Sequence, residues 1–478
     1  MRTEQGLGDY KMNYLIFGTG DYYNRYKKWF EHQEIVALLD NSKQKQYTMI
    51  DGIKVLPPEE GVKLQYDFII ILSFYIKQMK QQLISLGVCE NKIYHFYDLH
   101  QLFPPNKSYI QVQYYLNAEE IIQSQEQTSF KILLLSTDLT LGGPSIALFH
   151  AAMTLKKRGY TVVYAAMWDG ALKEKLIKHD IPVVVDENLP MLTMKQAAWV
   201  NTFSLIICNT LNFHVFLSER DTVIPVVWWL HDAGFFYDGV NRKVFERIHL
   251  ENLKVVTVGP VPEMAVKEFL PDLKCEELLY GVREVESCTV RKSDNNVIRF
   301  ITIGFLEDIK GQDILLQAVK KLPDHIRHKC EFYIVGHNKT LFGEKIQNES
   351  TNICEIVFTG SVSHEKIHEL LAASNVLICP SRQDTMPTVV AEAMMHAVPC
   401  IVSDAIGTTA YICDGVNGFI FKSEDVTALA EKIEWCVTNR EKLGETGRKA
   451  RSIYDKYFSI TAFETKFMKI VKDALGNQ

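Results

Sequence analysis

The sequence has no cysteine pair spaced for metal or redox chemistry. Its ten cysteines are scattered, and no two of them show the C-x-x-C spacing of a zinc site or a redox pair. Several lie inside apolar runs, as Cys208 does in residues 205–208. We therefore expect reduced, buried thiols in a reducing compartment.

Long apolar runs and a surplus of basic residues are also absent. Residues 226–230 form one of the longest apolar runs, far short of the ~20 residues of a membrane-spanning helix. Residues 1–13 lack a basic segment followed by an apolar one, so we expect no signal peptide and a cytoplasmic location, with peripheral contact with the inner membrane face left open. The 52 Lys and Arg against 58 Asp and Glu leave a net charge of −6, which argues against a nucleic-acid partner.

What the chain does have is a composition for about three globular domains: 478 residues, of which 47% are hydrophobic. Short apolar runs alternate with amphipathic segments, which is typical of parallel strands covered by helices on both faces. We predict an α/β protein with three Rossmann-like units. Prolines at 104–105 and polar stretches at 124–129 and 283–296 mark the boundaries. The predicted parts are an N-terminal domain at 12–105, a linker at 106–128, a middle domain at 129–287, a third domain at 288–450, and an amphipathic C-terminal helix at 451–478 that packs back on the middle domain.

Two acidic residues flank a predicted helix start in the third domain. Asp384 and Glu392 are eight residues apart, and Pro387 between them suits the first turn of a helix. Both carboxylates can then face one cleft, and the free N–H groups of the first turn, at Thr388 and Val389, would bind an anion such as a phosphate. An N-cap aspartate followed by a solvated glutamate is the alternative, and spacing alone favours it.

This segment resembles the E-x₇-E motif of the family 4 retaining glycosyltransferases. Residues 380–394 match the family's Pro-Ser-x-x-acid-x₇-Glu-Ala-Met pattern, with Asp384 in place of the first glutamate. Residues 304–311 resemble its glycine-x₅-Lys-Gly loop, in which Lys310 would grip the donor diphosphate. Phe305 stands where the family often has an arginine, and Arg382 is a candidate replacement.

The middle domain adds two further matches, so that the resemblance covers roughly residues 130–475. Gly142 and Gly143 resemble the family's N-terminal glycine loop, and His231 resembles its active-site histidine. A lone histidine after an apolar strand is more often structural than catalytic. Its position at a strand's carboxyl end, where α/β sheets bind ligands, favours the catalytic interpretation here.

The resemblance implies a GT-B fold, two facing Rossmann-like domains, preceded here by a third, small Rossmann-like domain. It also implies a hexosyltransferase that moves a sugar, with retention of configuration, from a UDP- or GDP-linked donor to a glycan or lipid-linked acceptor, as in bacterial surface polysaccharide synthesis. No Asp-x-Asp motif occurs anywhere in the sequence, so we expect neither a metal nor a cofactor besides the donor substrate. The expected catalytic residues are His231, Lys310 and Asp384, and the expected donor-binding residues are Gly142, Gly143, Lys310, Asp384, Thr388, Val389 and Glu392.

The N-terminal domain carries a weaker signal. Gly18 and Gly20 follow a predicted strand, and Asp40 lies about twenty residues further on, as in a dinucleotide fingerprint, but Tyr23 replaces the third glycine. The segment is also similar to the nucleotide-sugar-binding module of bacterial sugar acetyltransferases. A docking unit without a ligand is the simpler interpretation, and we expect residues 1–105 not to be needed for glycosyl transfer.

Two other functions stay open. One is an oxidoreductase or epimerase that uses the first Rossmann-like unit to modify a nucleotide sugar. The other is a non-catalytic sugar-nucleotide-binding partner of a transferase, favoured only by Asp384 and Phe305, which depart from the family pattern.

Overall fold

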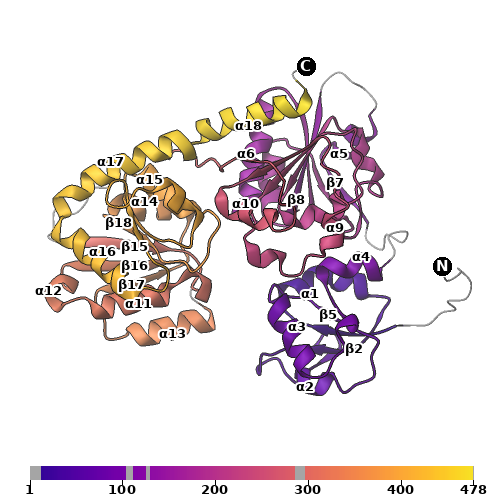
Figure 1. Cartoon of the computed structure of the whole chain (residues 1–478), viewed down its shortest axis with the longest axis horizontal. Helices are drawn as coiled ribbons and strands as arrows, with labels where there is room; N and C mark the ends of the chain where they lie inside the picture. Colours follow the sequence, from indigo (N-terminus) through magenta and orange to yellow (C-terminus); the bar gives the residue numbers. More distant parts are fainter. Residues whose placement is uncertain (1–11, 104–110, 125–129, 286–296, 338, 477–478) are drawn as a thin grey trace, which may run out of the picture. The chain divides into compact units, whose positions relative to one another are not determined.

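The structure is a computed structural model that describes residues 12–103, 111–124, 130–285, 297–337 and 339–476 (Figure 1). Among these residues, no helix is both long enough and apolar enough to cross a bilayer. Contacts group the chain into two compact units. The first unit is Met1–Trp228, Gly234–Lys254 and Glu268–Asp272, and the second is Trp229–Ala233, Val255–Lys267 and Leu273–Gln478.

The N-terminal sheet has six strands in the order β3-β4-β2-β1-β5-β6, parallel except for the β3–β4 pair. Its central strands are buried on both faces, since Leu15, Leu38 and Ile70 are fully inaccessible to solvent. The chain moves outward from β1 through β2 to β4 and then returns to β5, so the topological switch point lies between β1 and β5. The elements are β1 (Asn13–Phe17), α1 (Asp21–Tyr26), β2 (Glu34–Leu39), β3 (Met49–Ile50), β4 (Ile53–Leu56), α2 (Pro58–Gly61), β5 (Phe68–Ile71), α3 (Ile76–Ser85), β6 (Ile93–His95) and α4 (Leu99–Leu102).

The second sheet has eight strands in the order β14-β13-β12-β11-β8-β9-β10-β7. Its edge strand β7 is antiparallel to β10, whereas β8 is parallel to both of its neighbours. The elements are β7 (Gln113–Tyr115), α5 (Ala118–Gln123), β8 (Lys131–Asp138), α6 (Gly143–Lys157), β9 (Thr161–Trp168), α7 (Leu172–Lys178), β10 (Val183–Val185), β11 (Leu205–Asn209), α8 (His214–Leu217), β12 (Val226–Leu230), α9 (Arg242–Phe245), β13 (Leu253–Thr257), α10 (Pro260–Lys267) and β14 (Cys275–Glu277).

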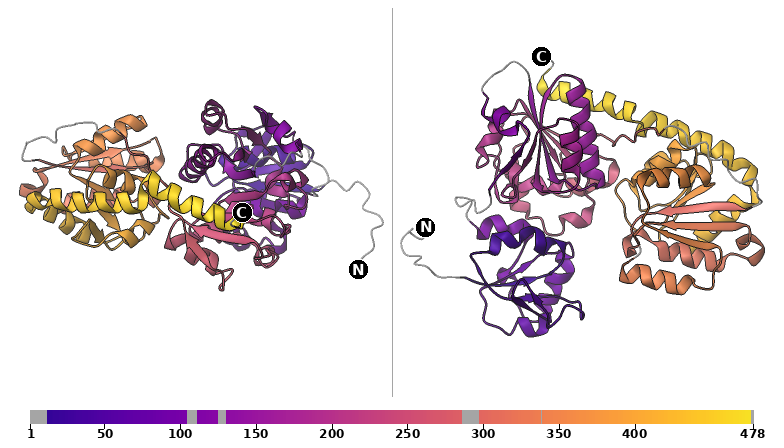
Figure 2. Two further views of the ribbon diagram at one scale, coloured as in Figure 1. Left: turned by 90° about the horizontal axis from the view of Figure 1, so that it is seen from above. Right: turned by 180° about the vertical axis from the view of Figure 1, so that it is seen from behind.

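The third sheet has six parallel strands in the order β17-β16-β15-β18-β19-β20, with helices on both faces (Figures 1 and 2). Three sheets that are parallel except at the edge strands β3 and β7, with covering helices, confirm the predicted α/β class. The elements are β15 (Ile298–Ile303), α11 (Gln312–Lys321), α12 (Asp324–Arg327), β16 (Cys330–Val335), α13 (Leu341–Ser350), β17 (Ile356–Gly360), α14 (His364–Ala373), β18 (Val376–Cys379), α15 (Thr388–Met395), β19 (Cys400–Ser403), β20 (Phe419–Phe421), α16 (Val426–Thr438), α17 (Leu443–Ile453) and α18 (Ile460–Leu475).

The predicted linker at 106–128 is partly structured. Its described residues include β7 and α5, and Tyr114 pairs with Val184 of β10. The prolines and polar residues of this segment suggested a linker. The short edge strand was not predicted because three residues are too few to show an alternating pattern. Residues 104–110, 125–129 and 286–296, and Cys288 with them, lie outside the described residues, so the domain boundaries stay a prediction.

The C-terminal segment is interrupted where the sequence predicts one continuous helix. A π-helical turn (Tyr454–Phe458) leads to Ser459, which is extended and caps α18 by accepting a hydrogen bond from the N–H of Ala462. The break arises because Val282 donates to the Phe458 carbonyl and accepts from the Ile460 N–H, as in a short strand pair. The expected apolar face is otherwise present. Its buried members are Phe458, Phe463, Phe467, Ile470 and Val471, and Phe463 stacks on Trp229 with the ring centroids 5.7 Å apart.

Candidate functional site

The first site element is a turn that only glycine can form, at the carboxyl end of β15. Gly311 has φ +68°, and a Cβ there would lie 2.1 Å from the carbonyl oxygen of Pro380. Gly336 approaches the Gly304 carbonyl just as closely, since its Cβ would lie 1.9 Å from that oxygen. Because these backbones are in contact, the preceding Lys310 is held at a defined place between β15 and α11.

Lys310 forms an ion pair with Asp384, although the two residues are far apart in the sequence. The Nζ atom donates to Oδ2 at 2.7 Å, and Asp384 also anchors the next loop by accepting the Gly407 N–H on its carbonyl oxygen. Burial opposes the charge of Lys310, but the attraction and hydrogen bond of Asp384 outweigh it and raise the pKa of the ammonium. The family resemblance gave Lys310 the donor diphosphate and made Asp384 a second donor-binding residue. The structure brings them into direct contact.

The helix that follows is α15, which begins at Thr388. Pro387 is its N-cap rather than its first residue, so Thr388 and Val389 form the start of the helix with both side chains half-buried. The first N–H groups of a helix have no partner within that helix, so this end could accept an anion. Glu392 lies further along α15 and is 9% exposed, not the solvated helix glutamate of the alternative interpretation.

Tyr280 is a residue that the motif search missed. It is buried, and its hydroxyl has no hydrogen-bond partner among the described residues. Burial first, and then the negative charges of Asp384 and Glu392, raise its pKa well above the usual value. The two acids therefore act on one buried hydroxyl. Only an unsatisfied polar atom in the folded chain marks this residue, and the sequence around it holds no motif.

His231 follows β12 in the second unit. Its Nε2 atom is buried without a hydrogen-bond partner among the described residues, and its ring centroid lies 4.8 Å from that of Trp229. Burial lowers the pKa of His231 to about 3, so the imidazole is neutral near pH 7. A neutral ring can exchange hydrogen bonds with a sugar hydroxyl, but it carries no charge to offer a diphosphate.

A group of three histidines near Glu392 was also missed. His364 Nε2 lies 3.6 Å from a Glu392 carboxylate oxygen, and His368 Nδ1 lies 3.0 Å from His396 Nε2. The His364 and His368 rings meet edge to face with centroids 4.5 Å apart. They come from α14 and the end of α15, so only packing of these helices brings the three rings together and His364 to Glu392.

Arg382, the candidate replacement for the missing phosphate contact at Phe305, is bound by two acids. Its guanidinium donates to both carboxylate oxygens of Asp313 at 2.8 Å, and it forms a second ion pair with Glu424 at 2.5 Å. Arg382 is therefore held within a network that ties its loop to the start of α11. Phe305 itself is 61% exposed.

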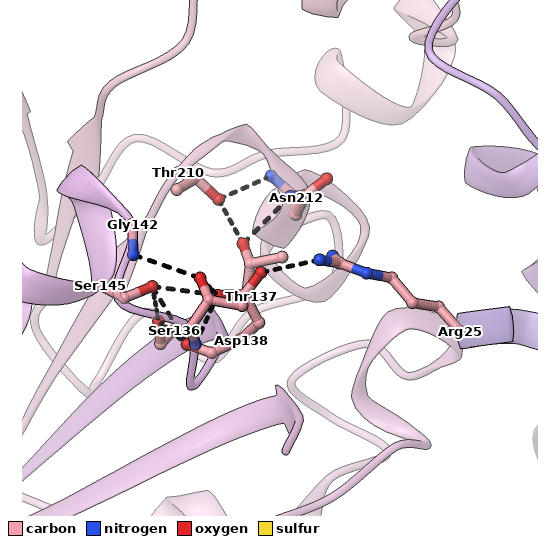
Figure 3. A network of polar contacts seen from close by, with 9 residues as sticks. Arg25, Ser136, Thr137, Asp138, Gly142, Ser145, Thr210 and Asn212 are labelled. Carbon is pink, nitrogen blue, oxygen red and sulfur yellow. Dashed lines mark hydrogen bonds and ion pairs between the residues drawn. The ribbon is translucent and has the colours of Figure 1, made fainter. Parts of the chain in front are cut away.

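The predicted glycine loop of the middle domain follows β8 in the first unit (Figure 3). Gly142 is the N-cap of α6, and its N–H donates to Thr140 Oγ1 at 3.4 Å. A Cβ at Gly143 would meet no atom within 4 Å. Asp138 organises the turn, because its Oδ1 accepts hydrogen bonds from the backbone and hydroxyl of Thr140 at 3.1 and 2.6 Å.

Gly18, Gly20 and Asp40 line a pocket of about 640 Å³ in the N-terminal domain. It lies at the carboxyl ends of β1, β2 and β5, which is the switch point where open α/β sheets bind ligands. Burial raises the pKa of Asp40, but hydrogen bonds from Thr19 and Ser42 and the charge of Lys45 outweigh it and lower the pKa below its usual value. A ligand here stays a prediction.

Metal ligands are not grouped in the part of the chain that the structure describes: no three His, Cys, Asp or Glu residues are arranged there to hold an ion. The predicted absence of a metal remains to be tested by experiment.

Comparison with known proteins assigns a class to this arrangement. Residues 128–256 match the family model "Glycosyl-transferase family 4", residues 289–453 match "Glycosyl transferases group 1", and residues 10–94 match "C2185-like, N-terminal". The crystal structure of Anabaena HepE in complex with UDP matches 72% of this chain and all of its own, with a TM-score of 0.63 at 20% identity. The fold is therefore that of the GT-B glycosyltransferases.

Two curated relatives align with more than half of the chain. Spore coat protein SA of Bacillus subtilis is 30% identical over 282 residues, which are 52% of this chain and 73% of that protein. The lipopolysaccharide glucosyltransferase WaaG of Escherichia coli is 25% identical over 351 residues, 65% of this chain and 86% of WaaG. Two other relatives align over only 40% and 30% of their own length. The chain belongs to the family 4 glycosyltransferases.

Proposed function

We propose that this chain transfers a hexose from a nucleotide-sugar donor to a glycan or lipid-linked acceptor, with retention of configuration. The observation that carries the proposal is the Lys310–Asp384 ion pair, which is held by a turn that only glycine can form. Asp384 and the buried Glu392 of α15 both act on the hydroxyl of Tyr280. A charged lysine at the carboxyl edge of a parallel sheet is suited to a diphosphate.

The residues divide the reaction between them. The donor diphosphate competes with Asp384 for Lys310, and the freed carboxylate then accepts hydrogen bonds from donor-sugar hydroxyls. The N–H groups of Thr388 and Val389 bind a phosphate, Glu392 binds the ribose, and neutral His231 contacts the reacting sugar. Lys310, with the amides of Gly142 and Gly143, stabilises the charge that develops on the leaving diphosphate, which needs no metal ion.

The donor base is proposed as uracil, with guanine as the alternative. The HepE structures contain UDP, UDP-glucose, or UDP with glucose, which supports the choice for this chain. WaaG is named as a lipopolysaccharide glucosyltransferase, and another relative is encoded in a cps region. We extend this to an acceptor in surface polysaccharide synthesis, made in the cytoplasm at the inner membrane face.

The test is donor turnover by Lys310→Ala beside a matched lysine variant of the same domain. Removing a charged hydrogen bond costs ~1.5–3 kcal/mol, so we expect at least about tenfold slower turnover. Lys320→Ala, which removes a surface lysine paired with Glu349 at 3.7 Å, is the control and should act like the wild type. Equal rates for both variants would refute the site. Donor binding without turnover in the wild type would favour a non-catalytic partner of a transferase. Hydride transfer or epimerisation of the nucleotide sugar would favour the oxidoreductase or epimerase alternative.

A further inference from the structure

Helix α1 of the N-terminal domain reaches the glycine loop of the transferase. Arg25, near the end of this helix, donates from Nη2 to Asp138 Oδ2 at 3.1 Å, and both residues belong to the first unit (Figure 3). Their side chains are 28% and 14% exposed, so the pair is partly shielded from solvent. Arg25 lies outside residues 128–256, which match the family 4 model, and inside residues 10–94, which match "C2185-like, N-terminal".

Aromatic rings hold Arg25 in place. Its guanidinium lies over the ring of Trp168, 5.0 Å from the centroid, and the ring of Tyr26 meets Trp168 edge-on at 5.2 Å. Trp168 is paired with Asp138 across β8 and β9. The arginine therefore rests on both residues that end these two strands, and its stacking restricts the directions that the guanidinium can take.

The two carboxylate oxygens of Asp138 have separate partners. Oδ1 accepts from Thr140 and, at 3.2 Å, from the Ser145 hydroxyl, so it holds the loop to the first turn of α6. Oδ2 accepts from Arg25 alone among the hydrogen bonds recorded for the described residues. Without Arg25 the carboxylate could rotate, and the bonds that shape the loop around Gly142 would loosen.

We propose that Arg25 is a positioning residue for the transferase: it orients Asp138 and thereby holds the backbone amides of Gly142 and Gly143 for the reaction. The proposal rests on the role given to these amides in the proposed function. The N-terminal domain then contributes to the rate of transfer through one contact, without touching the donor.

A second ion pair between the same two domains provides the control. Lys28 binds Glu187 at 2.6 Å, only three residues from Arg25, but Glu187 has no recorded hydrogen bond to the glycine loop. If Arg25 merely docks the N-terminal domain, its loss should act like the loss of Lys28. If it orients Asp138, the two variants should differ.

The kinetic experiment compares Arg25→Ala, Arg25→Lys and Lys28→Ala in the full chain. We expect Arg25→Ala to lower kcat about five- to tenfold with little change in donor KM, because the amides act on the charge of the leaving group. Arg25→Lys should recover part of the loss, and Lys28→Ala should stay within about twofold of the wild type. Equal losses for Arg25→Ala and Lys28→Ala would overturn the proposal.

Two further measurements separate this proposal from the proposed function. Hydrogen exchange of residues 137–146 should be faster in Arg25→Ala than in the wild type or Lys28→Ala, whether or not the chain transfers sugar. In a double-mutant cycle, Arg25→Ala should have a smaller effect when Asp138 is already Asn. Unchanged exchange, or fully additive effects, would show that Arg25 does not act through Asp138. If the wild type transfers no sugar but the difference in hydrogen exchange between it and Arg25→Ala is as expected, only the proposed function is refuted.

Discussion

A lysine–aspartate pair lies beside a glycine turn in two regions of this molecule, and the surroundings of the two pairs differ. In the N-terminal domain, Lys45 lies 3.6 Å from Asp40, only five residues away, and both also bond to Thr19. In the third domain, Lys310 and Asp384 meet at 2.7 Å across 74 residues of chain.

The two regions differ in whether buried polar atoms lack a hydrogen-bond partner among the described residues. None of the side chains that line the N-terminal pocket holds a buried polar atom without a partner, whereas Tyr280 and His231 in the second unit each do. Such an atom destabilises the fold by about 1–3 kcal/mol unless something binds it. Tyr280 and His231 therefore keep polar atoms that a ligand could satisfy, whereas His95 Nδ1, the buried atom without a partner among the described residues of the N-terminal domain, lies outside the pocket of that domain.

The largest effect on donor turnover should follow from changing an acid of the third domain. Glu392→Gln keeps the shape of a buried side chain but removes its charge, so donor turnover should fall about tenfold or more. Glu349→Gln, in the surface pair with Lys320, is the matched control. Steady-state kinetics of both variants measures this effect. A wild-type rate for Glu392→Gln would mean that turnover does not need this carboxylate, which would contradict the difference between the two regions.

Acid should weaken the second unit through His231. The unfolded ring binds a proton near pH 6.5 and the folded ring only near pH 3, so the unfolded state holds more protons between these values and stability falls as the pH falls. From pH 7 to pH 5 this group alone contributes a loss of up to about 2 kcal/mol. Urea unfolding of His231→Gln at both pH values should show a correspondingly smaller difference; an unchanged difference would mean that the ring protonates freely in the fold.

Tyr280→Phe tests whether the orphaned hydroxyl serves a ligand. The substitution removes a buried atom with no partner, so the melting temperature should stay the same or rise, while donor KM should increase several-fold, about 1 kcal/mol. Thermal unfolding and donor kinetics on the same sample separate the two effects. A destabilised variant with normal KM would assign the hydroxyl a structural role instead.

The smallest effects are expected in the N-terminal pocket. A Cβ at Gly20 would meet no atom within 4 Å, so Gly20→Val should fold normally, and Lys45→Ala should cost less than about 1 kcal/mol because its side chain is partly exposed. Donor KM should stay within about twofold for both. A chain that carries both Lys310→Ala and Glu392→Gln gives the opposite outcome if it still binds nucleotide. Loss of that binding when Gly20→Val is added would reveal a second nucleotide site in the N-terminal pocket.

The expectation that residues 1–105 can be removed changes with the structure. Donor binding should persist in a truncated chain, since Lys310, Asp384 and Glu392 all lie in the second unit. Transfer should slow, because Arg25 is lost, and the first unit should be less stable, because the ring of Tyr97 packs on that of His214 with centroids 5.0 Å apart. Polar breaks in a sequence show where a chain can be divided, but not which side chains cross the division.

The sequence alone determined the α/β class and the three strand–helix units, because apolar periodicity is a local property. Its resemblance to family 4 proposed Lys310, Asp384 and Glu392 as donor residues. Tertiary structure decided how these residues are used. It joined Lys310 to Asp384 and paired Arg25 with Asp138 across 113 residues. It left the Tyr280 hydroxyl and His231 Nε2 without hydrogen-bond partners among the residues that the structure describes. It also held Arg382 in a network and made an edge strand of residues 113–115. Contacts between distant segments depend on which surfaces pack together, and no local pattern in a single sequence records that.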